Sequence, residues 1–249
     1  MNHRRPLILM LSLAACVAAA QDGDDEFTST FPLDRCYFVP FGGNAYFNLN
    51  PGRQTYFDNS QCVEDGECDE EESLTITVTR DVEWIHLPGM RHRKPVRARV
   101  VEEYETAEGH VTEISRNFFA TCWPTGDVYY FGEDVDLYDD DGNVVSHEGA
   151  WRAGRDGAMP GIIMPGSAFL IGTRYYQEVA PPIAQDRAEH VATDLDVTVG
   201  AGSFNQCIEV EETIADEPDD VSTKVYCPGI GLVVDEDLEA VYTNDSRHW

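Results

Sequence analysis

The sequence predicts an all-β protein: one disulfide-braced domain, built as a curved antiparallel half-barrel or as a β-sandwich, with little helix. Apolar and polar residues alternate along several short segments, and Gly, Pro and Asp-Gly steps separate these segments. An even set of cysteines follows an export signal. Alternation with a period of two is typical of half-buried strands, and paired cysteines are typical of small exported domains.

The clearest strand lies where Leu74, Ile76 and Val78 alternate with threonines. The same alternation extends from Val96 to Val100, and the Asp-Gly step at residues 141–142 predicts a hairpin turn. Further strands are expected over residues 110–121, 127–133, 174–179, 204–213, 223–226 and 231–234. Segment 183–192 fits neither the helical nor the strand period, so it stays open as a helix candidate.

The first residues have the form of a signal peptide. Arg4 and Arg5 precede the apolar segment from Leu7 to Ala15, which is shorter than the ~20 residues that a spanning helix needs. A basic start followed by a short apolar run indicates a signal sequence. We therefore expect residues 1–20 to direct export, residues 21–35 to form an acidic flexible tether, residues 36–243 to form the β domain, and residues 244–249 to be a tail.

The apolar run ends in Leu13-Ala14-Ala15-Cys16, which resembles the lipobox of bacterial lipoproteins. In that case Cys16 carries the lipid and becomes the first mature residue. The resulting protein is anchored in the cell envelope, periplasmic or surface-facing, and touches the membrane only through its lipid. The alternative is cleavage after Ala18-Ala19-Ala20, which releases a soluble protein to the outside.

The cysteine count agrees with lipidation, because removing Cys16 from the seven cysteines leaves an even number. We expect a disulfide framework, whose pairing the sequence leaves open. Cys62 and Cys68 are close enough in sequence to close a small loop, and Cys122 is expected to reach Cys207 or Cys227 across a sheet. The six predicted disulfide cysteines are Cys36, Cys62, Cys68, Cys122, Cys207 and Cys227.

The charge is strongly acidic. The whole chain carries −29, with 46 acidic and 17 basic residues, and without Arg4 and Arg5 the charge is −31. Such a field repels nucleic acid, so no nucleic-acid partner is expected. The chain has two lysines, Lys94 and Lys224. Many acids with few lysines indicate a protein that stays soluble in a saline habitat.

Part of the chain resembles a known family. The middle contains the blocks Tyr-Tyr-Phe-Gly-Glu-Asp (129–134), Glu-Gly-Ala-Trp (148–151), Ala-Gly-Arg-Asp-Gly-Ala-Met-Pro-Gly-Ile-Ile-Met-Pro (153–165) and Tyr-Tyr-Gln-Glu (175–178). Together with Asn-Leu-Asn-Pro-Gly (48–52), these blocks resemble a family of uncharacterised bacterial secreted proteins and lipoproteins, over about residues 44–234. The resemblance implies a half-barrel akin to the folds of carriers of apolar ligands, and it implies no activity. An acidic insertion at about residues 58–73 and Cys227 depart from the family pattern.

The glycines and prolines from Gly154 to Gly166 predict an irregular loop. Such a loop is either a plug that fills the open side of a half-barrel or a lid over an apolar pocket. As a lid, it would cover a ligand site whose walls are expected to include Tyr130, Trp151, Met159, Ile162, Met164 and Tyr175.

Acidic residues offer one candidate metal site. Glu133, Asp134 and Asp136 lie close together in sequence, and oxygen ligands of this kind suit weak Ca²⁺ binding. The EF-hand pattern fails because Leu137 stands where an acidic ligand is needed. No other cofactor is expected.

Catalytic motifs are missing from the sequence. There is no G-x-S-x-G, no H-E-x-x-H and no phosphate-binding glycine loop, so we expect a non-enzymatic protein. Its expected partner is an apolar or amphiphilic small molecule, or another envelope component. One alternative is a structural or accessory subunit of an envelope or extracellular assembly. A second is a carboxylate-dependent hydrolase that uses Glu148, Asp156 or Glu178.

Overall fold

A computed structural model describes residues 27–88 and 94–244. Strands account for 60% and helix for 4%, which confirms the all-β class. The helices are a short 3-10 helix, η2 (Leu33–Arg35), and α1 (Ser60–Asp65). The strands are β1 (Phe38–Val39), β2 (Gln54–Asp58), β3 (Glu72–Ile85), β4 (Val96–Ala107), β5 (His110–Cys122), β6 (Val128–Tyr138), β7 (Val144–Ser146), β8 (Trp151–Arg152), β9 (Met159–Met164), β10 (Arg174–Tyr176), β11 (Glu178–Val179), β12 (Asp186–Val199), β13 (Gly202–Ile214), β14 (Glu217–Cys227), β15 (Gly231–Asp235) and β16 (Leu238–Thr243).

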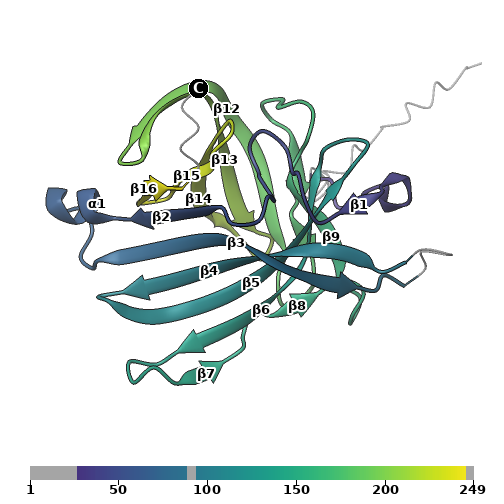
Figure 1. Cartoon of the computed structure of the whole chain (residues 1–249), viewed down its shortest axis with the longest axis horizontal. Helices are drawn as coiled ribbons and strands as arrows, with labels where there is room; N and C mark the ends of the chain where they lie inside the picture. Colours follow the sequence, from purple (N-terminus) through teal and green to yellow (C-terminus); the bar gives the residue numbers. More distant parts are fainter. Residues whose placement is uncertain (1–26, 89–93, 245–249) are drawn as a thin grey trace, which may run out of the picture.

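The strands form one antiparallel sheet that curls into a nearly closed barrel (Figure 1). The order along the sheet is β10, β12, β13, β14, β15, β16, β2, β3, β4, β5, β6, β9, β11. Its two ends belong to one chain segment, because β10 pairs with β12 while β11, starting two residues later, pairs with β9. Segment 174–179 therefore joins both ends of the sheet, and the fold is a barrel rather than a sandwich.

Tight turns join the long strands. Between β4 and β5, Glu108 and Gly109 both have positive φ, which matches the two-residue hairpin turn that follows the natural twist of a sheet. The predicted hairpin at residues 139–143 is confirmed: the Asp139 carboxylate accepts hydrogen bonds from the backbone N–H groups of Asp141 and Asn143, and β6 pairs with β7.

Two sequence predictions are corrected by the strands. The open segment 183–192 is no helix, because most of it belongs to β12, a long strand with register shifts near His190 and Leu195. The loop predicted from Gly154 to Gly166 contains the regular strand β9. At Gly161 any side chain would collide with the carbonyls of Tyr176 and Gln177, so glycine here allows the closing segment to approach β9. This stretch is thus barrel wall, neither plug nor lid.

The N-terminal segment covers the outer face of the barrel. Phe38 in β1 packs edge-on against Tyr129 and Phe131 of β6, and Phe31 packs against Tyr129. Thr28 pairs with Tyr175 of β10. The described part of the predicted tether, residues 27–35, therefore contacts the barrel.

All six predicted cysteines form disulfides: Cys36–Cys122, Cys62–Cys68 and Cys207–Cys227. The local Cys62–Cys68 loop is as expected. The expectation that Cys122 reaches Cys207 or Cys227 is wrong, because β1 pairs with the end of β5 and brings Cys36 to Cys122, whereas Cys207 and Cys227 lie on the paired strands β13 and β14.

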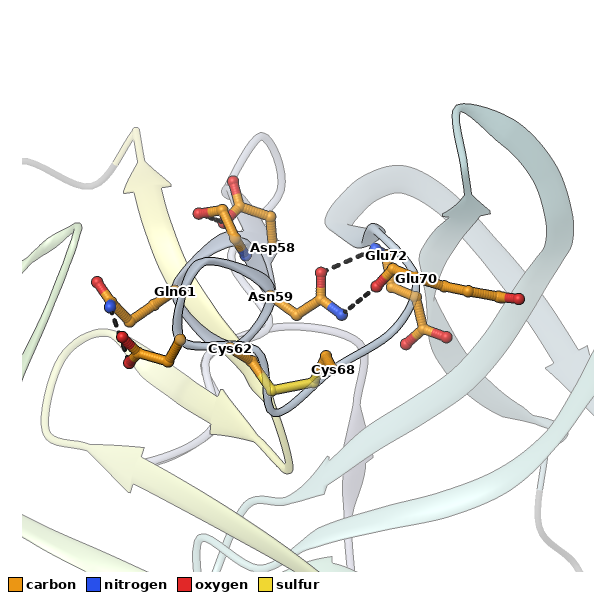
Figure 2. Close-up of a disulfide and its surroundings, with 9 residues drawn as sticks. Asp58, Asn59, Gln61, Cys62, Cys68, Glu70 and Glu72 are labelled. Carbon is orange, nitrogen blue, oxygen red and sulfur yellow. Dashed lines mark hydrogen bonds between the residues drawn. A yellow bond between two sulfur atoms is a disulfide. The ribbon is translucent and has the colours of Figure 1, made fainter.

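The Cys62–Cys68 disulfide closes the loop that contains α1 (Figure 2). Asn59, which is buried, holds the other end of this loop: its amide donates to the carbonyl of Glu70 and accepts from the N–H of Glu72, each at 2.9 Å. The loop thus forms a compact unit at the end of β2. Among the described residues, no helix is long and apolar enough to cross a bilayer.

Candidate ligand-binding site

A cavity of about 140 Å³ lies inside the barrel, between β2–β5 on one side and β13–β15 on the other. We call it the barrel cavity. Alternation along β3 gives it one wall, because Ile76 and Val78 face inward while the threonines between them face outward. The apolar side of the barrel cavity is formed by Phe47, Phe57, Ile76, Val78, Val101, Phe119, Ile163 and Leu232.

The opposite side of the barrel cavity is charged. Lys224 of β14 lies 3.4 Å from a carboxylate oxygen of Glu212 and 3.3 Å from one of Asp235. Burial lowers the pKa of Lys224, but the two carboxylates outweigh burial and hold the pKa well above its usual value. The second oxygen of Glu212 accepts a hydrogen bond of 2.6 Å from the side-chain amide of Gln177. Lys224 is therefore an ammonium ion fixed between strands β13 and β15.

Glu103 of β4 completes the charged side of the barrel cavity. Its side chain is half-buried and lines the barrel cavity. Burial raises the pKa of Glu103 to about 7, with Lys224 acting in the opposite direction. Within the described chain, no hydrogen bond or ion pair is formed by the Glu103 carboxyl. It is therefore an acceptor that faces the barrel cavity without a protein partner.

More carboxyls continue this charged layer through the barrel. Glu105 of β4 lies directly opposite Glu113 of β5. Glu133 of β6 lies opposite Asn117 of β5. Burial is the main cause that raises the pKa of Glu105 and of Glu133 to about 7, and it also raises the pKa of Glu113. The interior is thus amphiphilic, with an apolar wall and a layer of acids around one lysine.

Two acids, Glu178 and Asp186, extend the charged layer toward segment 174–179. One oxygen of Glu178 accepts a hydrogen bond from the backbone N–H of Asp186, while the other is buried without a partner. Burial raises the pKa of both groups, and each is raised further by neighbouring carboxylates. Burial therefore favours the protonated form of both acids more than water would.

The six predicted ligand residues do not line the barrel cavity. Tyr130 and Trp151 are buried and pack edge to face, with ring centroids 5.2 Å apart, and Met164 is fully buried. Tyr175 is buried, and its hydroxyl forms a hydrogen bond of 3.0 Å with Nε2 of His190. Met159 is exposed and Ile162 is half-buried. Four of the six belong to the buried core cluster.

Trp151 borders a second cavity, of about 210 Å³, beside β6 and β8. Its indole Nε1 is buried without a hydrogen-bond acceptor, and Glu133 and Arg155 lie on the same cavity wall. Arg152, on this wall as well, is already paired with Glu83 and Asp134. The walls carry both signs of charge, so this cavity has no clear ligand preference.

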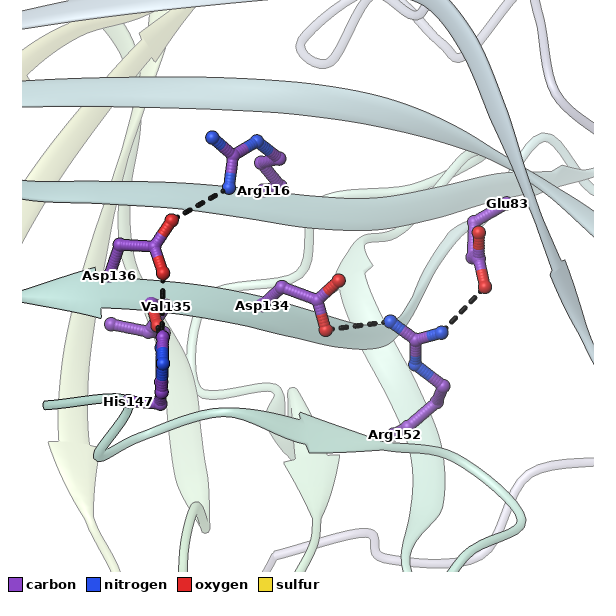
Figure 3. Close-up of polar contacts among 7 residues, drawn as sticks. All are labelled: Glu83, Arg116, Asp134, Val135, Asp136, His147 and Arg152. Carbon is purple, nitrogen blue, oxygen red and sulfur yellow. Dashed lines mark hydrogen bonds and ion pairs between the residues drawn. The ribbon is translucent and has the colours of Figure 1, made fainter. Parts of the chain in front are cut away.

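The predicted metal residues do not form a common site (Figure 3). Asp134 pairs with Arg152 at 2.7 Å, and Asp136 pairs with Arg116 and with His147, each at 3.0 Å. Glu133 faces the interior instead, because neighbouring strand residues point to opposite faces. Over the described residues, the one group of three with metal-ligand spacing is Cys62, Cys68 and Asp237, and the two sulfurs there are joined as a disulfide.

The predicted hydrolase acids are likewise scattered. Glu148 and Asp156 are exposed on the surface, while Glu178 is buried inside the barrel. The charged residues that do meet, Glu103, Glu212, Lys224 and Asp235, were not predicted. The only signal for them in the sequence is the rarity of lysine, since Lys224 is one of two.

Comparison with protein-family models, curated proteins and solved structures gave no match to this chain. The resemblance to a family of secreted proteins therefore stays a prediction. The site has to be interpreted from its own geometry.

Proposed function

We propose that this protein is a non-enzymatic binding protein of the cell envelope, which holds a small amphiphilic molecule in the barrel cavity. One observation carries the proposal: the cavity has an apolar wall on one side and fixed charges on the other. Ligand sites in proteins are typically apolar concavities with a few convergent polar groups. Phe47 and Phe119, whose rings lie 4.9 Å apart, contact the apolar part of the ligand. Glu103 and Lys224 orient its polar group.

Export supports this assignment. Three disulfides braced across the described chain indicate an oxidising compartment. Lipid attachment at Cys16, which lies outside the described residues, is part of the proposal. It explains the odd cysteine and leaves the other six in pairs.

Native mass spectrometry of the protein, purified from its own membrane in mild detergent, tests the proposal. We expect a lipid on Cys16 and an additional non-covalent mass that is lost on denaturation. Ile76→Phe, which fills the barrel cavity, removes that mass. The matched control Thr75→Phe adds the same ring to the neighbouring position on the opposite face of β3 and retains it. A bare polypeptide mass under the same conditions contradicts the proposal.

A second candidate function, a structural subunit of an envelope assembly, is favoured by one surface. Tyr37 is 72% exposed and Trp123 is 66% exposed, and the N–H of Trp123 donates to the carbonyl of Tyr37, so the two lie side by side. Neighbouring exposed aromatic residues favour protein contacts. In the same experiment this function predicts a complex with a second protein, which Trp123→Ser abolishes and Ile76→Phe leaves intact.

A further inference from the structure

The charges that line the barrel cavity are unbalanced. Three carboxyls, those of Glu103, Glu212 and Asp235, face two cationic side chains, those of Arg53 and Lys224. The Arg53 guanidinium donates to the carbonyls of Gly229 and Ile230 at 2.7 and 3.0 Å, and Lys224 is the cation that contacts two of the three carboxyls. The lining therefore carries one carboxyl more than it carries cations.

The three carboxyls differ in what they contact. Glu212 binds Gln177 and Lys224, and Asp235 binds Lys224. Glu103 makes no such contact with any described residue and faces the open space of the barrel cavity. A half-buried acceptor without a protein donor is satisfied only when a ligand or water supplies one. The geometry thus leaves a place for a donor next to Glu103.

The surrounding acids select the sign of that donor. Glu105, Glu113 and Glu133 lie in the layer behind Glu103, and all three interact electrostatically with it or with each other. Their combined field favours a positive group and disfavours a negative one, more strongly than in water because the interior is less polar. An anionic amphiphile, such as a fatty acid, would place a fourth carboxylate among these groups.

We propose that the ligand of the barrel cavity is a small primary amine, bound as an ammonium ion to Glu103 with its hydrocarbon part against Phe47, Ile76 and Phe119. This inference rests on the proposed function, since it names the ligand class of the same site. The volume fits: the cavity has about 140 Å³, and a cavity of about 150 Å³ holds a benzene molecule. Amines of six to seven non-hydrogen atoms are of this size.

A matched series of three probes tests the ligand class: hexylammonium, 1-hexanol and hexanoate, titrated by NMR into the exported full chain at pH 8. Burial raises the pKa of Glu103 to about 7, so this carboxyl is mostly ionised at pH 8, and the amine is protonated. We expect hexylammonium to bind at least about tenfold more tightly than 1-hexanol, because a charge-assisted hydrogen bond exceeds a neutral one. Hexanoate is expected to bind more weakly than either.

Glu103→Gln keeps the size of the side chain and removes its charge. We expect this variant to lose the preference for hexylammonium while its affinity for 1-hexanol is retained, which also shows that it is folded. Glu102→Gln is the control, because Glu102 is the neighbouring residue on the outer face, next to Arg116. It leaves all three affinities unchanged.

The outcomes separate the two proposals. Equal binding of hexylammonium and 1-hexanol, tighter binding of hexanoate, or an unchanged preference in Glu103→Gln overturns the amine assignment and leaves the binding function standing. If the folded protein binds none of the three probes in the barrel cavity, both proposals are wrong.

Discussion

Lys224 is the residue that makes the charged layer compatible with a folded barrel. It lies between Glu212 and Asp235, and the ammonium stabilises both carboxylates in a partly buried position. Removing one member of a buried ion pair costs more than the pair contributes, since the remaining charge is left without a partner.

We therefore expect Lys224→Met to lower the free energy of unfolding by about 3–5 kcal/mol at pH 8. The control is Lys94→Met, because Lys94 is exposed and substitutions at such positions change stability by about 0.5 kcal/mol or less. Urea unfolding of both variants provides the measurement. Equal stabilities for the two variants would contradict the role given to Lys224.

The interior glutamates predict how stability depends on pH. Burial raises the pKa of Glu103, Glu105 and Glu133 from 4.5 to about 7. Between these two values the folded state binds more protons than the unfolded state, so stability falls as the pH rises from about 4.5 to about 7. Above that window these groups add no further slope.

By urea unfolding, we expect the protein to be more stable at pH 5.5 than at pH 8 by about 2 kcal/mol or more. The triple variant Glu103→Gln, Glu105→Gln and Glu133→Gln reduces this difference, whereas Glu102→Gln on the outer face does not. A stability that rises from pH 5.5 to pH 8 would show that these carboxyls are not buried as described.

Glu102 and Glu103 also show why the site could not be read from the sequence. The two acids are identical neighbours, and only the parity of β4 decides which one faces the barrel cavity. Glu103 lies opposite Ile76 of β3, and a single sequence does not show this pairing. The sequence shows which charged residues are present, but it does not show which of them face the barrel cavity.

At the scale of elements, the regular strands were predictable and the irregular ones were not. The prediction around Leu74, Ile76 and Val78 holds because these residues are more buried on one face of β3. Residues 110–121 also form a strand, although both faces of its second half are buried. β12 carries several register shifts, which break the period that identifies a strand. β9 was missed because Pro160 and Gly161 indicate a loop locally, while pairing with β6 and β11 stabilises an extended strand.

The three disulfides are expected to stabilise the barrel unequally. Cys36–Cys122 spans 86 residues, Cys207–Cys227 spans 20 and Cys62–Cys68 spans 6. The entropy of loop closure then gives about 4–5, 3 and 2 kcal/mol respectively. Cys36–Cys122 also holds the segment whose Phe31 and Phe38 cover the outer face of β6.

Replacing both cysteines of one disulfide by alanine, one disulfide at a time, tests this order by urea unfolding. The pair Cys36→Ala and Cys122→Ala is expected to lower stability most, and the pair Cys62→Ala and Cys68→Ala least, because Asn59 still holds the α1 loop. The opposite order would mean that the N-terminal segment contributes little to the barrel.

For the whole molecule, closure of the barrel is the feature that most limits prediction. Both ends of the sheet meet in segment 174–179, where Tyr175 pairs with Ala188 of β12 and Glu178 pairs with Pro160 of β9. Local sequence patterns predict which segments form strands, but they do not predict which strands pair. The patterns expected for a half-barrel and for a barrel are therefore the same. The curved sheet was predicted, and the pairing of β10 and β11 adds the near-closure.

Net charge acts on the whole molecule as well. The chain without its first arginines carries −31, and such an excess of one sign destabilises a compact state through self-repulsion. We expect an increase from about 0.05 to about 1 M NaCl to raise the free energy of unfolding by on the order of 1–2 kcal/mol, because the Debye length falls to about 3 Å. Urea unfolding at both salt concentrations measures this change, and a decrease would indicate that surface ion pairs outweigh repulsion.

The central claim is that the barrel cavity is a ligand site. A crystal structure of the protein purified from its own envelope, without extraction of bound molecules, tests it most directly. The account predicts non-protein electron density between the apolar wall at Phe47 and Phe119 and the carboxyl of Glu103. A cavity that holds only ordered water, or that the side chains of Ile76 and Leu232 have closed, would contradict it.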